Sequence, residues 1–321
     1  MSRPLVSIIM PTFNHASFIG DAIDSVLNQT YNHFELIIID NYSTDSTEKI
    51  IRSFSDQRIK YYRFSNNGII AASRNCGIKN ARGEFIAFLD SDDLWYENKL
   101  ARQVEAMARE PDAALCFCPF KMDSDDQEYN NEIRTARDQN FSGHIYDRFL
   151  NCNFMAASSV LIRAVVLKLT GDFDVASNLV GAEDFDLWLR ISRDNKICYV
   201  PEVQGTYRLH AANYGGSVDR IEKPINVINK HFSLGWIDKR KAGCAKANFY
   251  FREGWVFINK DAVLARTYFL KTLNVNTGNV RIILASLIGL FFSLFPALHR
   301  SIRKGHWDKR IGKLFFNAQS L

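Results

Sequence analysis

The sequence lacks the two glycine motifs that mark the commonest nucleotide-binding folds. A dinucleotide-binding fold needs Gly-x-Gly-x-x-Gly after its first strand, and a P-loop needs Gly-x-x-x-x-Gly-Lys-Ser/Thr. Here the first apolar run, Leu5 to Met10, leads instead into Pro-Thr-Phe-Asn-His-Ala. A dinucleotide-dependent dehydrogenase and a P-loop enzyme are therefore excluded.

Closely paired cysteines are also missing. The six cysteines include no Cys-x-x-Cys pair, and Cys116 and Cys118 have no histidine nearby that would complete a zinc site. We expect buried, reduced thiols, as in a cytosolic protein. The amino terminus, Met-Ser-Arg-Pro, has no signal-peptide pattern, so we expect the body of the protein to stay in the cytoplasm.

Excess positive charge is missing from most of the chain. The net charge is +5 at pH 7, but residues 281–321 alone hold seven Lys and Arg against one acid, Asp308. The rest of the chain is close to neutral. Because it has no basic stripe that could follow phosphates, we expect no nucleic-acid partner.

The most informative stretch present is Phe85 to Trp95, which reads Phe-Ile-Ala-Phe-Leu-Asp-Ser-Asp-Asp-Leu-Trp. Its apolar run predicts a strand buried on both faces, which ends at Asp90, Asp92 and Asp93. Burying carboxylates without partners is costly, so we expect all three at the open carboxyl edge of a sheet. Mg²⁺ or Mn²⁺ would relieve their mutual repulsion and keep coordination positions for phosphate oxygens.

A second copy of Asp-Ser-Asp-Asp spans residues 123–126. No amphipathic helix resumes after it, so we expect an exposed loop there. The first copy has a bland alternative too, a solvated turn that caps the next helix. An Asp-x-Asp sequence is therefore weak support by itself, and its surroundings decide.

Strand-like and helix-like runs alternate through the first 95 residues. Further strands are expected at Leu5–Met10, Phe34–Ile39 and Ile59–Phe64, with a helix after each. This alternation predicts a mostly parallel sheet that helices cover on both faces. Ligands of such sheets gather at the carboxyl ends of the strands.

Six motifs in order resemble the family 2 glycosyltransferases of the GT-A fold. They are Pro-Thr-Phe-Asn, Ile-Ile-Ile-Asp-Asn-Tyr-Ser-Thr-Asp, Asn-Gly-Ile-Ile-Ala-Ala-Ser-Arg-Asn-Cys-Gly-Ile-Lys-Asn-Ala-Arg-Gly-Glu, Phe-Leu-Asp-Ser-Asp-Asp, Gly-Ala-Glu-Asp-Phe-Asp-Leu-Trp-Leu-Arg and Tyr-Arg-Leu-His. The set covers about the first 215 residues, and its order is far more specific than any one motif. The resemblance implies an α/β fold with a GT-A-type mostly parallel, mixed sheet flanked by helices, and a helical C-terminal extension.

The resemblance also implies a function. The chain would be an inverting, metal-dependent glycosyltransferase that uses Mn²⁺ or Mg²⁺ and a nucleotide diphosphate-sugar, preferably a UDP-sugar. The acceptor would be a glycan or a lipid-linked sugar in the synthesis of a cell-surface polysaccharide or glycolipid. Two other classes stay open: a nucleotidyltransferase that makes nucleotide-sugars, and a non-catalytic nucleotide-sugar-binding protein. The first should carry a glycine-rich triphosphate loop near the start, and the second has no use for a paired Glu183-Asp184.

Matching positions imply roles for individual residues. Thr12 and Asp40 would contact the base and ribose, Arg74 would lie along the nucleotide, Asp90 would approach the ribose, and Asp92 would bind the metal. The other residues expected at the nucleotide-sugar are Pro11, Phe13, Asn14, Asn67, Gly68, Ser91 and Arg208. This chain departs from the family at Asn41 and Tyr42, which replace the usual second acidic residue and glycine after Asp40.

Glu183 and Asp184 open a predicted helix, and one of them is expected to be the catalytic base. Asp184 is the first candidate to take the proton of the acceptor hydroxyl, and Glu183 is the second. The alternative is that both acids only complement the positive end of the helix dipole. His210 ends a later predicted strand and is a candidate metal ligand or diphosphate contact, the alternative being a packed or solvated histidine.

The chain is expected to divide near residue 220, with the nucleotide-sugar-binding and catalytic domain over 1–220 and a helical region over 221–321. Within that region Ile282 to Phe295 is almost wholly apolar, and basic residues follow it. About 17 apolar residues are marginal for a bilayer span, which needs roughly 20. We expect residues of about 280–315 to attach peripherally to the inner face of the cell membrane. Packing against the body or a second subunit is the alternative, which leaves a homo-oligomer open.

Overall fold

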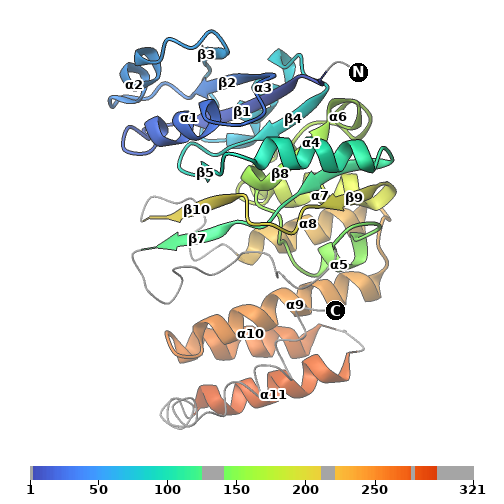
Figure 1. Ribbon diagram of the computed structural model, residues 1–321. Coiled ribbons are helices and arrows are strands. Elements are labelled where there is room, and N and C mark those ends of the chain that lie inside the picture. Colours follow the sequence, from blue (N-terminus) through green and yellow to red (C-terminus); the bar gives the residue numbers. More distant parts are fainter. Residues whose placement is uncertain (1–2, 125–140, 211–220, 276–278, 295–321) are drawn as a thin grey trace. The chain divides into compact units, whose positions relative to one another are not determined.

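The computed structural model describes residues 3–124, 141–210, 221–275 and 279–294 (Figure 1). Its contacts divide the chain into two compact units. The first contains residues 1–146 and 154–216, and the second contains residues 147–153 and 217–321. The second unit thus includes a short segment from the middle of the chain.

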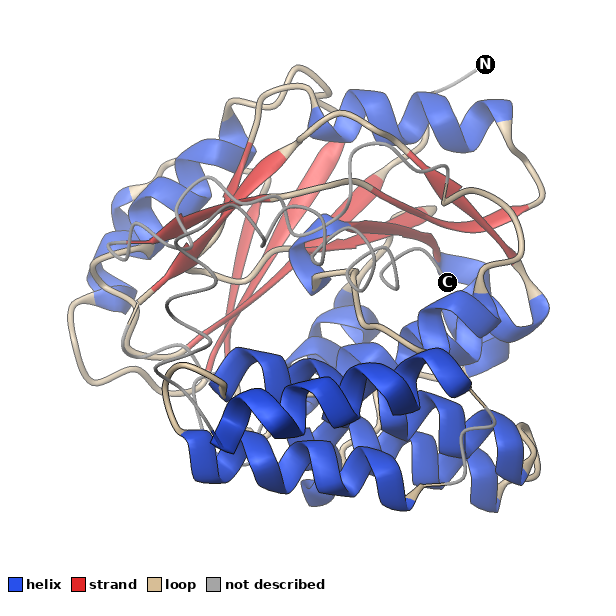
Figure 2. Ribbon diagram, turned by 90° about the horizontal axis from the view of Figure 1, so that it is seen from below, coloured by secondary structure: helices blue, strands red, loops and turns tan. Residues whose placement is uncertain are grey.

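A seven-stranded mixed sheet forms the centre of the first unit. The strand order is β3-β2-β1-β4-β8-β6-β9, and only β8 runs antiparallel to its neighbours β4 and β6. The strands are β1 (Val6–Thr12), β2 (Phe34–Asp40), β3 (Ile59–Arg63), β4 (Phe85–Phe88), β6 (Ala113–Phe117), β8 (Val160–Arg163) and β9 (Lys196–Tyr199). The mostly parallel, mixed sheet predicted from the sequence is confirmed, and its strands form the red layer in Figure 2.

Helices cover both faces of this sheet. Side chains of successive residues of β1 point to opposite faces. Ile8 and Met10 share a core with α1 (Ile19–Leu27) and α4 (Lys99–Arg109). On the other face Ile9 lies against Gly77 of α3 (Ile70–Asn80), where an added Cβ would come within 2.3 Å of the Ile9 side chain. The glycine therefore allows α3 to pack closely on β1. The other helices of this unit are α2 (Thr47–Ser53), α6 (Ala164–Thr170) and α7 (Glu183–Asp194).

A second, three-stranded sheet follows the acidic turn. Its order is β5-β10-β7, with β5 at Leu94–Trp95, β10 at Gly205–Leu209 and β7 at Lys121–Ser124. The prediction of an exposed loop at 123–126 is wrong for its first half. Asp123 and Ser124 pair with β10, because main-chain hydrogen bonds to a distant strand replace the missing local pattern. Residues 125 and 126 lie outside the described residues.

Helices form the second unit. They are α5 (Tyr146–Leu150), most of which belongs to this unit, α8 (Glu222–Ser233), α9 (Lys239–Phe257), α10 (Ala262–Asn274) and α11 (Val280–Leu294). Figures 1 and 2 show α9, α10 and α11 side by side. The ring of Phe269 on α10 fits against Gly254 and Gly289, where a Cβ would lie 2.6 and 2.3 Å from it. Small residues thus set the close spacing of these three helices.

The apolar segment predicted near the C-terminus is only partly described. Helix α11 covers residues 280–294, while the remainder of the expected segment and its basic residues lie outside the described residues. Of the helices that the structure describes, none is both long and apolar enough to cross a membrane.

Candidate functional site

Three loops with left-handed backbone lie at the carboxyl edge of the sheet. Asn14, Tyr42 and Asn67 have φ values of 51°, 58° and 52°, and each lies in the loop that follows β1, β2 or β3. Outside glycine this conformation is uncommon and costs energy, and such positions gather at functional sites. The strain therefore points to the same edge as the sequence motifs.

Hydrogen bonds connect the loops after β1 and β2. The Asn41 N–H donates to the Thr12 carbonyl at 3.0 Å, and the Asn14 N–H donates to the Ser43 hydroxyl at 2.9 Å. The Thr44 N–H donates to Asn14 Oδ1 at 2.8 Å. Asn14, predicted at the nucleotide, is thus also a clamp between the two loops.

Asp40 is fully buried at the end of β2. Its Oδ1 accepts hydrogen bonds from the Ser43 N–H at 2.9 Å and the Ser43 hydroxyl at 2.6 Å, and its Oδ2 accepts one from the Tyr61 hydroxyl at 2.6 Å. Burial and the bond to Asp40 raise the pKa of Tyr61 to about 12. In this structure Asp40, predicted at the base, shapes the loop that follows it.

Thr12, at the end of β1, differs from Asp40 in that its side-chain oxygen has no hydrogen-bond partner. Its side chain is 5% exposed, and its hydroxyl oxygen is buried without a hydrogen-bond partner. An unsatisfied buried hydroxyl is unfavourable, and a ligand would relieve that cost only where the surrounding atoms part to admit it. Neighbouring Pro11 is buried within β1, while Phe13 projects beyond the strand with 49% of its surface exposed.

The loop before α3 contains the next two predicted residues. Asn67 and Gly68 are both exposed, and both have left-handed backbone. The Gly68 N–H donates to Asn66 Oδ1 at 2.8 Å, and the Asn66 N–H donates to Asn41 Oδ1 at 2.9 Å. The third loop is thereby tied to the second.

Arg74 of α3 lies inside the protein and holds two carboxylates. Only 3% of it is exposed; its Nη2 is 2.7 Å from Asp90 Oδ1 and its Nη1 is 2.6 Å from Glu183 Oε1. Burial alone lowers the pKa of Arg74, but the charges of Asp90 and Glu183 outweigh burial and raise it overall. Arg74, predicted to lie along the nucleotide, joins the end of β4 to the start of α7.

Asn75, next to Arg74, fixes the segment that leads to α7. Its Nδ2 donates to the Phe173 carbonyl at 2.8 Å, and its Oδ1 accepts from the Phe173 N–H at 3.0 Å. Arg190 of α7 adds hydrogen bonds to the carbonyls of Thr170 and Asp172 at 2.8 and 2.7 Å. Asn75 was not among the predicted site residues, although it lies in the same motif as Arg74.

The two acids at the start of α7 have different surroundings. Glu183 is 4% exposed; its Oε1 bonds to Arg74 and its Oε2 accepts from the Gly181 N–H. Asp184 is half-buried, and its Oδ1 accepts from the Phe185 N–H at 2.6 Å. Asp184 is thus the more accessible carboxylate, and α7 begins at the residue that the sequence predicts.

Each carboxylate of the acidic turn has its own partner. Asp90 pairs with Arg74, and Asp92 Oδ2 lies 3.0 Å from His210 Nε2. The expectation that Asp93 meets solvent or ligand at the open edge is wrong. It is buried, and it accepts hydrogen bonds from the Ser158 hydroxyl and the Arg208 N–H, which compensate for its burial.

Asp92 and His210 are the side chains best placed for a divalent ion. No group of three or more His, Cys, Asp or Glu side chains that could hold a metal occurs among the residues that the structure describes. Ions that act on nucleotide phosphates usually have few protein ligands and complete their coordination with phosphate oxygens and water. The Asp92–His210 pair fits this arrangement, and its nitrogen favours Mn²⁺ over Mg²⁺, which prefers oxygen.

Two aromatic residues near this pair were not predicted. His15 Nδ1 lies 2.7 Å from the hydroxyl of Ser91, which is buried. The Phe18 ring stacks on His210 at 4.4 Å, and the Arg208 guanidinium lies 5.0 Å from the same ring. Their only sequence signal is their place directly after Pro-Thr-Phe-Asn.

Arg208, predicted at the diphosphate, reaches back toward α1. Its Nη1 lies 3.0 Å from Asp21 Oδ2, its Nη2 donates to the Phe18 carbonyl at 3.1 Å, and its Nε donates to the Asp92 carbonyl. It therefore holds the turn that carries Asp92 against the first helix.

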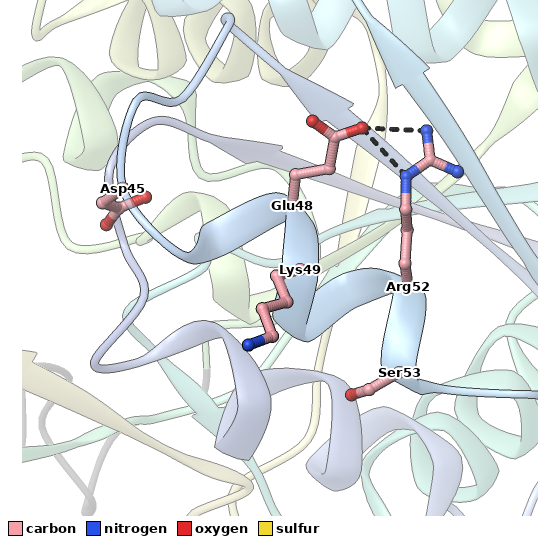
Figure 3. Close-up of a pocket in the computed structure, with 5 residues that line it drawn as sticks. All are labelled: Asp45, Glu48, Lys49, Arg52 and Ser53. Carbon is pink, nitrogen blue, oxygen red and sulfur yellow. Dashed lines mark hydrogen bonds and ion pairs between the residues drawn. The ribbon is translucent and has the colours of Figure 1, made fainter.

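A separate surface hollow lies along α2 and is lined by Asp45, Glu48, Lys49, Arg52 and Ser53 (Figure 3). Glu48 pairs with Arg52 at 2.8 Å and with Arg63 at 2.7 Å. The lining contains neither the acidic turn nor the start of α7, so we assign it no role in the chemistry.

The double ion pair makes a testable prediction. Arg74→Met leaves two carboxylates without their cation, so we expect it to lower the free energy of unfolding by about 3 kcal/mol at pH 7. Adding Glu183→Gln should recover part of that loss, because it removes one of the stranded charges. The measurement is denaturant unfolding of both variants and the wild type.

The matched control is Arg109→Met, which removes the exposed pair with Glu105 and should cost less than about 1 kcal/mol. Strictly additive effects of Arg74→Met and Glu183→Gln would contradict the coupling.

Known proteins resemble this chain in sequence and in fold. The family model described as Glycosyl transferase family 2 matches residues 7–169. An uncharacterized glycosyltransferase of Rickettsia prowazekii, RP339, is 32% identical over 213 residues, 65% of this chain and 65% of that protein. The match therefore spans slightly less than two thirds of that relative.

Two further proteins extend the comparison. The Escherichia coli UDP-Glc:alpha-D-GlcNAc-diphosphoundecaprenol beta-1,3-glucosyltransferase WfgD is 37% identical over 200 residues, 61% of this chain and 73% of that protein. The Pyrobaculum calidifontis mannosyltransferase PcManGT, solved with GDP-Man and Mn²⁺, superposes with a TM-score of 0.60 at 20% identity, over 96% of this chain and 88% of that one. It shares the fold. The family model, which matches just over half of the chain, shows that the chain belongs to glycosyl transferase family 2.

Proposed function

We propose that the chain transfers a sugar from a nucleotide diphosphate-sugar, by preference a UDP-sugar, to a glycan or lipid-linked acceptor in cell-surface polysaccharide or glycolipid synthesis. The observation that carries the proposal is the bridge through Arg74, which holds the acidic turn beside the start of α7. Family membership supports the reaction class. WfgD, which uses UDP-Glc and a diphosphoundecaprenol-linked acceptor, supports the substrate class.

The donor would lie across the carboxyl edge from β2 to β4. These strands flank β1, so their ends are two strand spacings apart, about 10 Å. The base would meet the Thr12 hydroxyl and the Phe13 ring, and the diphosphate would reach the turn that carries Asp92. This span suits a nucleoside diphosphate.

Asp92 and His210 would hold the divalent ion at the diphosphate. A bound Mn²⁺ or Mg²⁺ supplies positive charge where the leaving group gains negative charge. Arg208, bonded to the Asp92 carbonyl, places a second positive group nearby. PcManGT, which shares the fold, was solved with Mn²⁺, and this supports the use of a divalent ion.

Asp184 is the proposed base. As the acceptor oxygen bonds to the anomeric carbon, the bond from that carbon to the diphosphate oxygen breaks, and the acceptor proton passes to an Asp184 oxygen. One displacement of this kind inverts the anomeric centre. Glu183, whose two oxygens already have partners, would position the start of α7.

Asp184→Asn tests the base. We expect kcat to fall by about 10²- to 10⁴-fold, because the amide cannot accept the proton, while the thermal midpoint stays unchanged. The measurement is transfer from UDP-sugars to a lipid-linked acceptor.

The matched control is Asp194→Asn, an exposed acid at the other end of α7. Full activity of Asp184→Asn would contradict the assignment. A wild type that binds donor without turnover would support the non-catalytic alternative.

Asp92→Asn tests the metal site. Chelation should abolish transfer and Mn²⁺ should restore it, and the variant should need at least about tenfold more Mn²⁺ for half-maximal rate. The control is Asp123→Asn, in the second Asp-Ser-Asp-Asp copy, which is exposed on β7. Undiminished activity after chelation would rule out metal dependence.

We also propose that the C-terminal region attaches to an anionic membrane face. Six apolar side chains form one stripe along α11, each 37–65% exposed: Val280, Leu284, Leu287, Ile288, Phe291 and Leu294. The opposite side packs through Ala285, Ser286 and Gly289. The sequence after α11 contributes six Lys and Arg and one Asp. An apolar stripe followed by basic residues suits lipid tails and acidic headgroups.

The double variant Leu287→Glu/Phe291→Glu tests this attachment. Two charges on the stripe should reduce co-sedimentation with anionic vesicles at least about tenfold, because apolar burial drives the binding. The control is Val165→Glu/Leu169→Glu, on exposed apolar residues of α6. Unchanged vesicle binding would contradict the proposal, and a dimer that the same change dissociates would support packing between subunits.

A further inference from the structure

Tyr42 combines a strained backbone with an exposed ring. Its φ of 58° is in the left-handed region, which a bulky side chain seldom adopts, and 52% of its surface is exposed. The family's usual residue here is glycine, which would adopt this backbone without strain. Because about half of its surface stays in solvent, burial of the ring offsets this cost only in part.

The loop imposes this backbone regardless of the side chain. On one side the Asn41 N–H bonds to the Thr12 carbonyl, and on the other the Ser43 N–H bonds to Asp40 Oδ1. Both bonds would form equally well around a glycine. These main-chain bonds therefore give no reason for a tyrosine here, and the contacts of its ring are the next feature to consider.

One neighbour of the ring is known. The guanidinium of Arg63, at the end of β3, lies 5.4 Å from the centre of the Tyr42 ring. Arg63 is itself held by Glu48 at 2.7 Å, the same Glu48 that faces Arg52 in Figure 3. The ring is thus steadied by a fixed cation, as expected for a preorganised contact surface.

We infer that Tyr42 packs against the planar base of the donor nucleotide and helps to determine which base is accepted. The inference rests on the proposed function, because it presumes a nucleotide-sugar donor. Tyr42 follows β2, two strands from the acidic turn that would hold the diphosphate, and it lies in the loop bonded to Thr12. Every base has an aromatic face, and an exposed tyrosine ring is a good surface for it.

The alternative residue shows why this position affects selectivity. Glycine leaves open space beside the base, whereas tyrosine fills that space with a rigid ring. WfgD uses UDP-Glc and PcManGT was solved with GDP-Man, so proteins with this fold accept different bases. Because Tyr42 stands where the family usually has glycine, it is a candidate for the residue that selects the base.

The test compares Tyr42→Gly and Tyr42→Phe with the wild type by calorimetric titration of UDP, GDP, CDP and inorganic pyrophosphate in Mn²⁺. For the nucleotide that the wild type binds best, Tyr42→Gly should weaken binding about tenfold, and Tyr42→Phe should stay within about twofold. Pyrophosphate, which has no base, should bind all three proteins equally. The thermal midpoint of Tyr42→Gly should be unchanged or higher, because glycine relieves the left-handed strain.

Each outcome has one meaning. Equal nucleotide binding by Tyr42→Gly and the wild type would overturn the inference and leave the proposed function intact. Equal weakening of nucleotide and pyrophosphate would also overturn it, because the loss would not depend on the base. A wild type that binds none of the three nucleotides would contradict the UDP-sugar donor of the proposed function.

Discussion

The buried guanidinium of Arg74 is the interaction on which the rest of the site depends. It joins the end of β4 to the start of α7, so the acidic turn and the candidate base are held in one frame. A buried charge is tolerated only when it is paired, and here two carboxylates share one cation. The same arrangement explains why Glu183 and Asp184 differ. Both side-chain oxygens of Glu183 have partners and the residue is buried, whereas Asp184 is half-buried and is the proposed base.

The acidic turn shows how identical side chains take different roles through their partners. Asp93 is buried against Ser158, Asp90 belongs to the Arg74 bridge, and Asp92 faces His210. Asp92, which lies beside His210, is the one that we propose as a metal ligand. The loops after β1 and β2 differ in the same way: Asp40 bonds within its own loop, while the exposed rings of Phe13 and Tyr42 are the groups that we propose to meet a ligand.

In the second unit, packed and exposed residues lie on opposite sides of α11. Small residues on one side of α11 allow the Phe269 ring to approach, and large apolar residues occupy the other side. Packing against neighbouring helices accounts for the small residues on one side of α11, but not for the large apolar residues on its exposed side. The proposed function would use both features: the first unit for a polar, charged donor, and the exposed stripe of α11 for an apolar environment.

The sequence by itself determined the first four strands, β1 to β4, the mostly parallel arrangement of the sheet, the edge on which the motifs meet and the residue at which α7 begins. Those features follow from local patterns of apolar residues and from the order of short motifs. Only the tertiary structure decided that Arg74 pairs with Glu183, 109 residues away, that Asp40 and Asp93 are buried and satisfied, and that Tyr42 is left-handed with its ring exposed. Partners distant in sequence leave no local pattern. The residues around an Asp or Glu in the sequence do not indicate whether its carboxylate will bond to an arginine, a hydroxyl or a ligand.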